Sequence, residues 1–429
     1  MLAAFAWADS GLMALTGPAD AAPLVPAFDL IGAVARLCRS VRERAAGFGS
    51  GCGASPSILT ERAALLRLRR GGQISCNASC RLLEARDGWL AVNLPRPTDW
   101  ESIAAWLGCR IRGHGDWQTV AAAVRLGTVA DLTERAQLLS LAVGRHADRA
   151  PLRRPEAVSS CAPDANGNTV VARHGRRPLV IDLSALWAGP LCSALLRECG
   201  ARVVRVEDRK RLDGSRIRSN AFFARLNAGK ESVVLDFDSD RHRRALRTAI
   251  DRADIVISSA RPRALDQLGL TPEVFLQRNP DLIWIAITAY GWRDVGEHRV
   301  GFGDDVAVQA GLTAMQSDGR PVFVGDAIAD PLAGLQAARC AFSAWSSGRG
   351  GLYDISLFAT ADCAARGAPL SEFERGVVVR RRNGWWLRVG SRARRVTLPK
   401  PPPYVERVRS LGADTTKFVA QFGAWRSMA

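Results

Sequence analysis

Two short strings of the sequence combine residue types that could hold a phosphate-bearing ligand. Ala188, Gly189 and Pro190 form a turn after a predicted strand, where a glycine lets the backbone approach a ligand and the next helix offers its free N–H groups. Asn227 and Lys230 follow in LNAGKES, on a glycine-containing loop where lysine suits a point-charge contact to phosphate. A plain tight turn and a surface loop remain the structural alternatives.

Asp330 is the candidate carboxylate of the sequence. It precedes Pro331 in the string DPLAG, at the predicted start of a helix. A helix N-terminus favours the ionised form, and neighbouring N–H groups can stabilise a developing oxyanion. The alternative is that Asp330 caps the helix, and the two roles are compatible. Asp326, four residues earlier, is the competing candidate.

Histidine and cysteine offer no comparable constellation. The five histidines are isolated along the chain, and only Cys76 and Cys80 are close enough to suggest a pair. No further Cys or His beside them completes a ligand set, so we expect no metal site and no histidine base.

From Arg176 onward, short β-branched runs alternate with helical stretches. This alternation predicts a Rossmann-like, mostly parallel sheet with helices on both faces. The first unit lacks G-x-G-x-x-G, so the usual dinucleotide fingerprint is absent. The expected strands cover residues 178–184, 201–207, 231–237, 253–259, 282–291 and 351–358.

The first 150 residues have a different texture, which predicts a smaller α+β domain. Its predicted parts are an Arg-rich helix at 59–70, the loop GGQISCNAS at 71–79, a hairpin at 81–94, and helices around 100–107 and 131–141. Residues 151–177 have the composition of a linker. We therefore expect domains at 1–150 and 178–429.

Composition and charge narrow the classes of protein. The chain has 429 residues, of which 47% are hydrophobic and 24% charged, which is typical of a globular protein with two or three domains. Its 59 basic and 42 acidic residues give a net charge of +17, but only four of the basic residues are lysines. This arginine bias favours a solvated Arg-rich surface over a dedicated nucleic-acid surface. Without a membrane-length apolar run or a leader pattern, we expect a soluble, cytoplasmic protein.

Five motifs resemble, in order, the family III CoA-transferases of the CaiB/BaiF type, which include formyl-CoA transferase and the α-methylacyl-CoA racemases. They are VIDLSALWAGPLCSALLRECGARVVRVE, RLNAGKESVVLDF, ADIVISSARPRALDQLGL, NPDLIWIAITAYG and DPLAG, within residues 178–358. The resemblance implies coenzyme A as a substrate, with no permanently bound cofactor. It also implies acyl-CoA and carboxylic-acid substrates. For assembly it implies a homodimer, or a dimer with a homologous subunit.

The resemblance also implies roles for individual residues. Asp330 would be the catalytic carboxylate, on which mixed anhydrides and an aspartyl-CoA thioester form as intermediates. The implied CoA-binding residues are Trp187, Ala188, Gly189, Arg205, Arg209, Asn227, Lys230 and Ala264. Further residues expected to line the site are Asp304, Asp305, Gly334, Ser75 and Ser79.

Two departures from the family pattern affect these expectations. The small-domain-like stretch lies near the N-terminus, while LGADTTKFVAQFG (411–423) resembles the family's closing segment, so the order looks permuted or fused. Where the racemase branch has G-H-D, this chain has Gly303, Asp304 and Asp305. Racemisation needs a base and a conjugate acid on opposite faces, so losing the histidine favours transfer. The loop at 71–79 is the nearest candidate for the family's glycine-rich loop.

Three hypotheses follow from the sequence. The first is a CoA-transferase that uses Asp330, and the second is a catalytically degenerate CoA-binding relative or subunit. The third is a nucleic-acid-binding protein, based on the arginines and tryptophans of residues 377–395. For the first, we expect Asn227 and Lys230 to lie on an exposed loop, where their substitution would weaken CoA binding without unfolding the domain.

Overall fold

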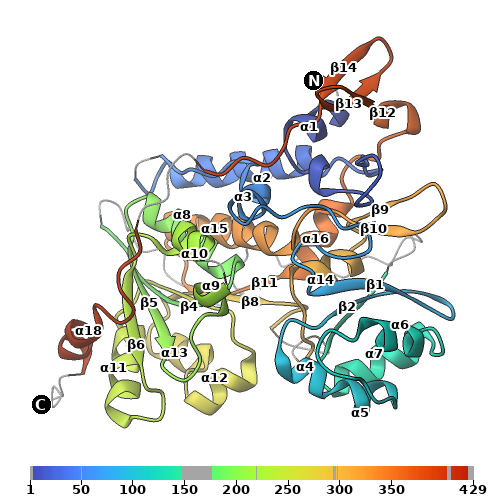
Figure 1. Ribbon diagram of the computed structural model, residues 1–429. Helices are drawn as coiled ribbons and strands as arrows, with labels where there is room; N and C mark the ends of the chain where they lie inside the picture. The colour runs from blue at the N-terminus through green and yellow to red at the C-terminus, as the bar shows by residue number, and fades with distance from the viewer. Residues whose placement is uncertain are drawn as a thin grey trace, which may run out of the picture.

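A computed structural model shows a six-stranded parallel sheet at the centre of the chain (Figure 1). The structure describes residues 3–49, 51–146, 176–218, 220–292, 296, 298–402 and 407–423. The strand order is β11-β8-β7-β4-β5-β6, and every neighbouring pair is parallel. The strands are β4 (Leu179–Leu183), β5 (Arg202–Asp208), β6 (Glu231–Leu235), β7 (Ile255–Ser258), β8 (Ile283–Thr288) and β11 (Gly351–Ser356). The Rossmann-like prediction is confirmed.

Helices cover both faces of this sheet because successive strand residues point to opposite sides. Val180 packs into the hydrophobic cluster of one face, and its neighbour Ile181 packs into that of the other. The first face carries α2 (Leu30–Ala45), α8 (Ala188–Glu198), α10 (Asn220–Asn227) and α15 (Ala329–Ser347). The second carries α11 (Asp240–Asp251), α12 (Pro262–Leu268), α13 (Pro272–Arg278) and α18 (Thr415–Phe422).

A smaller antiparallel sheet lies beside the large one (Figure 1). It consists of β1 (Cys80–Ala85), β2 (Gly88–Asn93) and β3 (Ala142–Arg145), so the predicted hairpin is confirmed. Four helices share its core: α4 (Pro97–Glu101), α5 (Ile103–Leu107), α6 (Trp117–Val124) and α7 (Val129–Leu138). The indole of Trp106 is fully buried there and donates to the carbonyl of Leu132 at 2.8 Å.

Four helical elements within residues 3–65 pack against the large sheet's helical layer. These elements are α1 (Ala3–Asp9), the 3-10 helix η1 (Met13–Leu15), α2 and α3 (Ile58–Leu65). Their apolar residues share one cluster with α8 and α15. Of the predicted linker, residues 151–175 lie outside the described residues, so the division into domains at that point stays a prediction.

The remaining elements connect these layers. They are α9 (Gly214–Arg218), α14 (Gly303–Gln309), β9 (Thr313–Met315), β10 (Pro321–Phe323), α16 (Leu357–Ala365), α17 (Glu372–Arg375), β12 (Val377–Arg381), β13 (Gly384–Val389) and β14 (Arg392–Arg395). Strands β12, β13 and β14 form an antiparallel sheet that projects from the body next to α1 (Figure 1).

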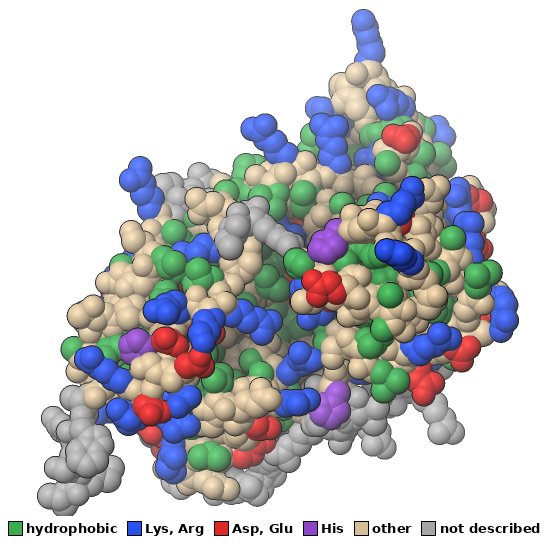
Figure 2. Space-filling view, turned by 60° about the horizontal axis from the view of Figure 1, so that its bottom comes forward, with side chains coloured by type: hydrophobic (Ala, Val, Ile, Leu, Met, Phe, Trp, Pro, Cys, Tyr) green, Lys and Arg blue, Asp and Glu red, His purple; other side chains and the backbone are tan. Residues whose placement is uncertain are grey.

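Basic side chains are dispersed over the surface. On the face shown in Figure 2, Lys and Arg lie scattered, with acidic side chains among them. Among the helices of the described residues, none combines the length and the apolar character needed to cross a membrane.

Candidate active site

Four aspartates gather where α14 meets the start of α15. Asp304 and Asp305 lie in the first turn of α14, Asp326 lies just before α15, and Asp330 is the second residue of α15. The first three side chains are buried, with exposed fractions of 3%, 0% and 0%, whereas Asp330 is partly exposed. The tertiary structure thus concentrates carboxyl groups and leaves one of them accessible.

Asp330 does not cap its helix. The N-cap of α15 is Ile328, and no side chain supplies a capping hydrogen bond there. Within the described part of the chain, no hydrogen bond engages the Asp330 carboxyl oxygens. The capping interpretation of the sequence is therefore wrong, because the helix begins at Ala329, two residues earlier than the D-P signal suggested.

The backbone around Asp330 is tightly packed. A Cβ atom on Gly303 would lie 2.7 Å from Oδ2 of Asp330 and 2.4 Å from the carbonyl oxygen of Ala327. Ala327 itself has a positive φ of 44°, which is strained for a residue with a side chain. Its N–H donates to Oδ1 of Asp304 at 2.9 Å, which helps to hold this conformation.

Burial raises the pKa of all four carboxyl groups. For Asp330 the pKa rises to about 7, because desolvation and the neighbouring aspartates outweigh the opposing charge of Arg62. Desolvation likewise raises the pKa of Asp305 to about 7 and that of Asp326 to about 6. The pKa of Asp304 is raised by the same cause. Carboxyls with such values are common at functional sites.

The loop at 71–79 contacts this cluster, as its sequence suggested. Asn77 donates from Nδ2 to Oδ2 of Asp304 at 3.0 Å, and the thiol of Cys76 donates to the carbonyl of Gly325 at 3.2 Å. Ser75 and Ser79 reach the cluster through Asn77, because their hydroxyls donate to its Oδ1 at 3.0 and 2.7 Å. The sequence analysis missed Asn77 itself.

A second asparagine, from the small sheet, donates a hydrogen bond to another aspartate of the cluster. Asn93, at the end of β2, donates from Nδ2 to Oδ1 of Asp305 at 2.8 Å. The backbone N–H of Phe302 donates to the same oxygen at 3.0 Å. The sequence contains no local signal for this contact, since 212 residues separate the two side chains.

Arg62 on α3 is the basic residue that the sequence analysis missed. Its Nη1 lies 3.0 Å from Oδ1 of Asp326, and its guanidinium lies 5.4 Å from the ring centroid of Trp187 and 5.7 Å from that of Phe222. Arg62 thereby connects the aspartates to the predicted CoA-binding turn.

The predicted turn at 187–190 begins α8, which packs on α15. Trp187, Ala188 and Gly189 are all buried. A Cβ atom on Gly334 would lie 2.7 Å from the carbonyl oxygen of Ala188, so Gly334 permits close contact between the two helices. Ala264 lies on α12 and is half-buried.

Asn227 and Lys230 are buried, which contradicts the expectation of an exposed loop. Their exposed fractions are 4% and 2%. The Lys230 ammonium donates to Oδ2 of Asp182 at 3.3 Å, the carbonyl of Pro190 at 3.0 Å, Oγ of Ser193 at 2.6 Å and Oδ1 of Asn227 at 3.0 Å. The loop therefore places a cation against the buried Asp182 carboxylate rather than in solvent.

Arg205 and Arg209 lie in different environments. Arg205 is 2% exposed and pairs with Asp213 at 2.5 Å, while the Arg209 side chain is 71% exposed and lies 3.9 Å from Asp236. The Arg205 guanidinium retains two nitrogens, Nε and Nη1, without a hydrogen-bond partner. Both nitrogens still lie close to carboxylates, Nε at 3.6 Å from Glu207 and Nη1 at 3.7 Å from Asp182, so Arg205 is held in place by three acids.

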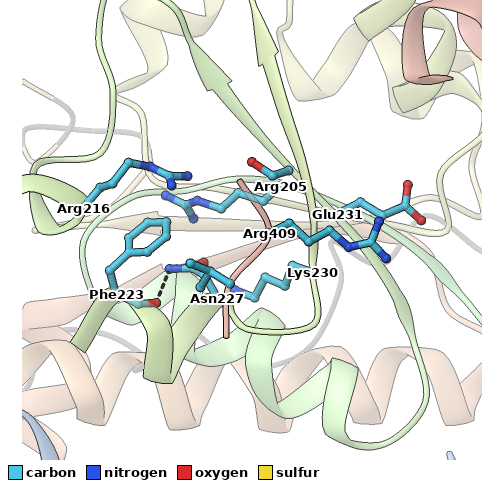
Figure 3. Close-up of a pocket in the computed structure, with 9 residues that line it drawn as sticks. Arg205, Arg216, Phe223, Asn227, Lys230, Glu231 and Arg409 are labelled. Carbon is cyan, nitrogen blue, oxygen red and sulfur yellow. Dashed lines mark hydrogen bonds between the residues drawn. The ribbon is translucent and has the colours of Figure 1, made fainter. Parts of the chain in front are cut away.

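Arg205 also lines a small pocket that is rich in arginine (Figure 3). Arg205 and Arg216 both lie over the ring of Phe223, at 5.5 and 4.1 Å from its centroid. The full lining comprises Arg205, Arg216, Phe223, Asn227, Lys230, Glu231, Ser232, Val408 and Arg409. Within the described residues, no group of three or more His, Cys, Asp or Glu side chains is arranged to hold a metal ion.

Comparison with known proteins agrees with the motifs of the sequence. Residues 178–384 match the model of CoA-transferase family III. Succinyl-CoA:mesaconate CoA-transferase of Haloarcula hispanica is 35% identical over 170 residues, which cover 35% of this chain and 42% of that protein. Human alpha-methylacyl-CoA racemase is 36% identical over 112 residues, or 26% of this chain and 27% of that one.

A solved structure, a CAIB/BAIF family protein from Brucella suis, aligns at 24% identity with a TM-score of 0.44, over 49% of this chain and 64% of that one. The chain therefore spans less than half the length of these two curated relatives. The similarity to CoA-transferase family III is therefore established for residues 178–384.

Proposed function

We propose that this protein is an enzyme that transfers CoA between an acyl-CoA thioester and a carboxylic acid, with Asp330 as the covalent carrier. The observation that carries the proposal is the Asp330 carboxyl. It lies within the region matched to the family, caps no helix, and is the accessible member of a cluster of four acids. A group with these features is available for reaction.

The proposed reaction balances without any further reactant. The Asp330 carboxylate attacks the thioester carbonyl, and the C–S bond breaks to give a mixed anhydride and CoA thiolate. The thiolate attacks the aspartyl carbonyl, which releases the first acid and leaves an aspartyl-CoA thioester. The second acid attacks this thioester, and its C–S bond breaks to give a new mixed anhydride and CoA thiolate. The thiolate then attacks the acyl carbonyl that comes from the second acid, which forms the new acyl-CoA and releases the Asp330 carboxylate.

The raised pKa of Asp330 suits this cycle at neutral pH. With a pKa of about 7, roughly half of the Asp330 carboxyls are ionised near neutrality, so the nucleophilic form is available. A carboxylate in a largely desolvated site is also a stronger nucleophile than one in bulk water.

CoA binding is part of the same proposal. Trp187, Ala188 and Gly189 lie at the start of the helix that packs on α15, and the family resemblance assigns CoA to this turn. Arg205, Arg216 and Arg409 line one small pocket, and binding of a ligand phosphate there would use the charge-assisted hydrogen bonds that arginine forms with phosphate. Lys230 would act indirectly, by holding the Asp182 network beneath the turn.

The test is an intact-mass experiment. The protein is incubated with a panel of acyl-CoAs and weighed, and the modified peptide is mapped. We expect an adduct of acyl or CoA mass on the Asp330 peptide that disappears in Asp330→Asn. Asp354→Asn is the matched control, because Asp354 is a half-buried carboxyl outside the cluster whose pKa is also raised by desolvation. CoA binding by the wild type without any adduct would instead indicate a catalytically degenerate relative.

A homodimer and a cytoplasmic location are further parts of the proposal. The chain has a mass of 46.3 kDa, so light scattering at micromolar concentration should report about twice that value. An active species at the mass of a single chain would refute the dimer. Measuring the affinity for CoA after substitution of Arg205 or of Arg209 would show whether either residue contributes to CoA binding.

A further inference from the structure

Arg62 lies at the junction of the four-aspartate cluster and the predicted CoA-binding turn, although it comes from a segment far from both in the sequence. Its Nη1 is 3.0 Å from Oδ1 of Asp326, which is 264 residues away. Asp326 is fully buried, and its other oxygen, Oδ2, has no hydrogen-bond partner. Asp326 therefore depends on Arg62 for its neutralising contact.

The orientation of Arg62 is fixed by more than this ion pair. Its guanidinium lies against the rings of Trp187 and Phe222, with centroid distances of 5.4 and 5.7 Å. These two rings contact each other edge to face at 4.9 Å. Stacking on aromatic faces holds a guanidinium while leaving its edge free for other contacts. The Arg62 side chain keeps 18% of its surface exposed, so it borders accessible space.

Helix α3, which carries Arg62, is docked by a second ion pair. Glu61, the preceding residue, accepts from Nε of Arg225 on α10 at 2.8 Å. Arg225 also pairs with Glu198 of α8 at 3.4 Å. This second pair anchors α3 without contacting the four aspartates, so anchoring and charge can be tested separately.

The charge balance of the cluster depends on Arg62. The groups whose charges act on Asp330 are Asp304 and Asp305 from α14, Asp326 from the preceding loop, and Arg62 from α3. The Cys76 thiol, from the loop at 71–79, interacts electrostatically with Asp304, Asp326 and Arg62. The carboxyl neighbours raise the pKa of Asp330, whereas Arg62 lowers it. Arg62 also lowers the pKa of Asp304 and Asp326.

We propose that Arg62 is a positioning residue of the candidate site: its ion pair holds Asp326 in place, and its positive charge offsets the acids that surround Asp330. The ion pair, the stacking on Trp187 and Phe222, and the position of α3 carry this inference. It deepens the proposed function, since an ionised Asp330 is the nucleophile of that reaction. It also assigns a role in the site to the N-terminal segment, outside the region matched to the family.

The first experiment measures the Asp330 carboxyl directly and needs no activity. The protein is labelled with carboxyl-¹³C aspartate, the Asp330 signal is assigned by its loss in Asp330→Asn, and its titration is followed by NMR. In Arg62→Gln we expect the ratio of carboxylate to carboxylic acid at pH 7 to fall about tenfold, because a nearby positive charge is lost. Arg62→Lys should recover most of this ratio, since it keeps the charge.

Arg225→Gln is the matched control. It loosens α3 through Glu61 but leaves the Arg62 charge in place, so the Asp330 titration should match the wild type. An Asp330 titration that is the same in Arg62→Gln and in the wild type would overturn the inference. So would an equal shift in Arg225→Gln, because docking of α3 rather than charge would then be the cause.

The second experiment separates this inference from the proposed function. The rate of adduct formation at Asp330 is measured against pH in the wild type and in Arg62→Gln. We expect the variant's profile to be displaced to higher pH, with a rate close to the wild type's in alkaline solution. If the wild type titrates as described but forms no adduct, the proposed function fails and the role of Arg62 stands. If both form adducts with the same profile, Arg62 has no such role and the function stands.

Discussion

Replacing Lys230 with methionine should destabilise the protein strongly, although the sequence places this residue on a loop. Methionine keeps most of the volume of lysine but removes its charge and its donors. Four acceptors then lose a partner: Asp182, Ser193, Asn227 and the carbonyl of Pro190. Asp182 keeps Arg205 at 3.7 Å and the hydroxyl of Ser184, so its charge is only partly compensated. Breaking a buried ion pair by removing one partner costs about 3–5 kcal/mol.

The assay is equilibrium unfolding in urea, followed by fluorescence and circular dichroism. The free energy of unfolding of Lys230→Met should fall by about 3–5 kcal/mol with an unchanged dependence on urea. Lys210→Met is the control, because Lys210 also pairs with an aspartate, Asp238, but their side chains are 60% and 71% exposed. Exposed pairs contribute about 0–1 kcal/mol. A loss below about 1 kcal/mol in Lys230→Met would refute the reasoning that this network is a buried structural element.

Two further predictions concern the aspartate cluster. Gly303→Ala should slow adduct formation at Asp330 at least about tenfold and lower the free energy of unfolding by about 1–3 kcal/mol, because the alanine Cβ would lie 2.4 Å from the Ala327 carbonyl oxygen. Gly51→Ala is the control, since no atom lies within 4 Å of its Cβ, and it should change neither the rate nor the stability. The pKa of Asp305 is about 7 in the folded state and about 4 in the unfolded chain. The folded state therefore binds the Asp305 proton more tightly, and the free energy of unfolding should fall as pH rises from 4 to 7. Asp305→Asn should reduce this slope by up to about 1.4 kcal/mol per pH unit in urea unfolding at several pH values, and an unchanged slope would contradict the assignment.

The sheet and its helices were predictable because their signals are local. Each strand, such as 179–183 or 283–287, is a run of β-branched and other apolar residues, which fits a strand buried on both faces. The position of Asp330 near a helix start was also readable, since proline is favoured in the first turn. Whether Asp330 capped that helix was not readable, because the answer depends on where the preceding loop places Ile328.

The site depended on contacts that no local pattern contains. Arg62 meets Asp326 across 264 residues, and Asn77 meets Asp304 across 227. One arginine among so many has no distinguishing neighbours in the sequence, so its role follows only from the docking of α3 against Trp187. The burial of Lys230 has the same origin, because Asp182 lies on another strand of the sheet. The sequence by itself determined the strands, the helices and the candidate carboxylate, since these arise from the periodicity of neighbouring residues. The tertiary structure alone decided which charges meet, because the free energy of a charge is set by its surroundings in space and its degree of burial.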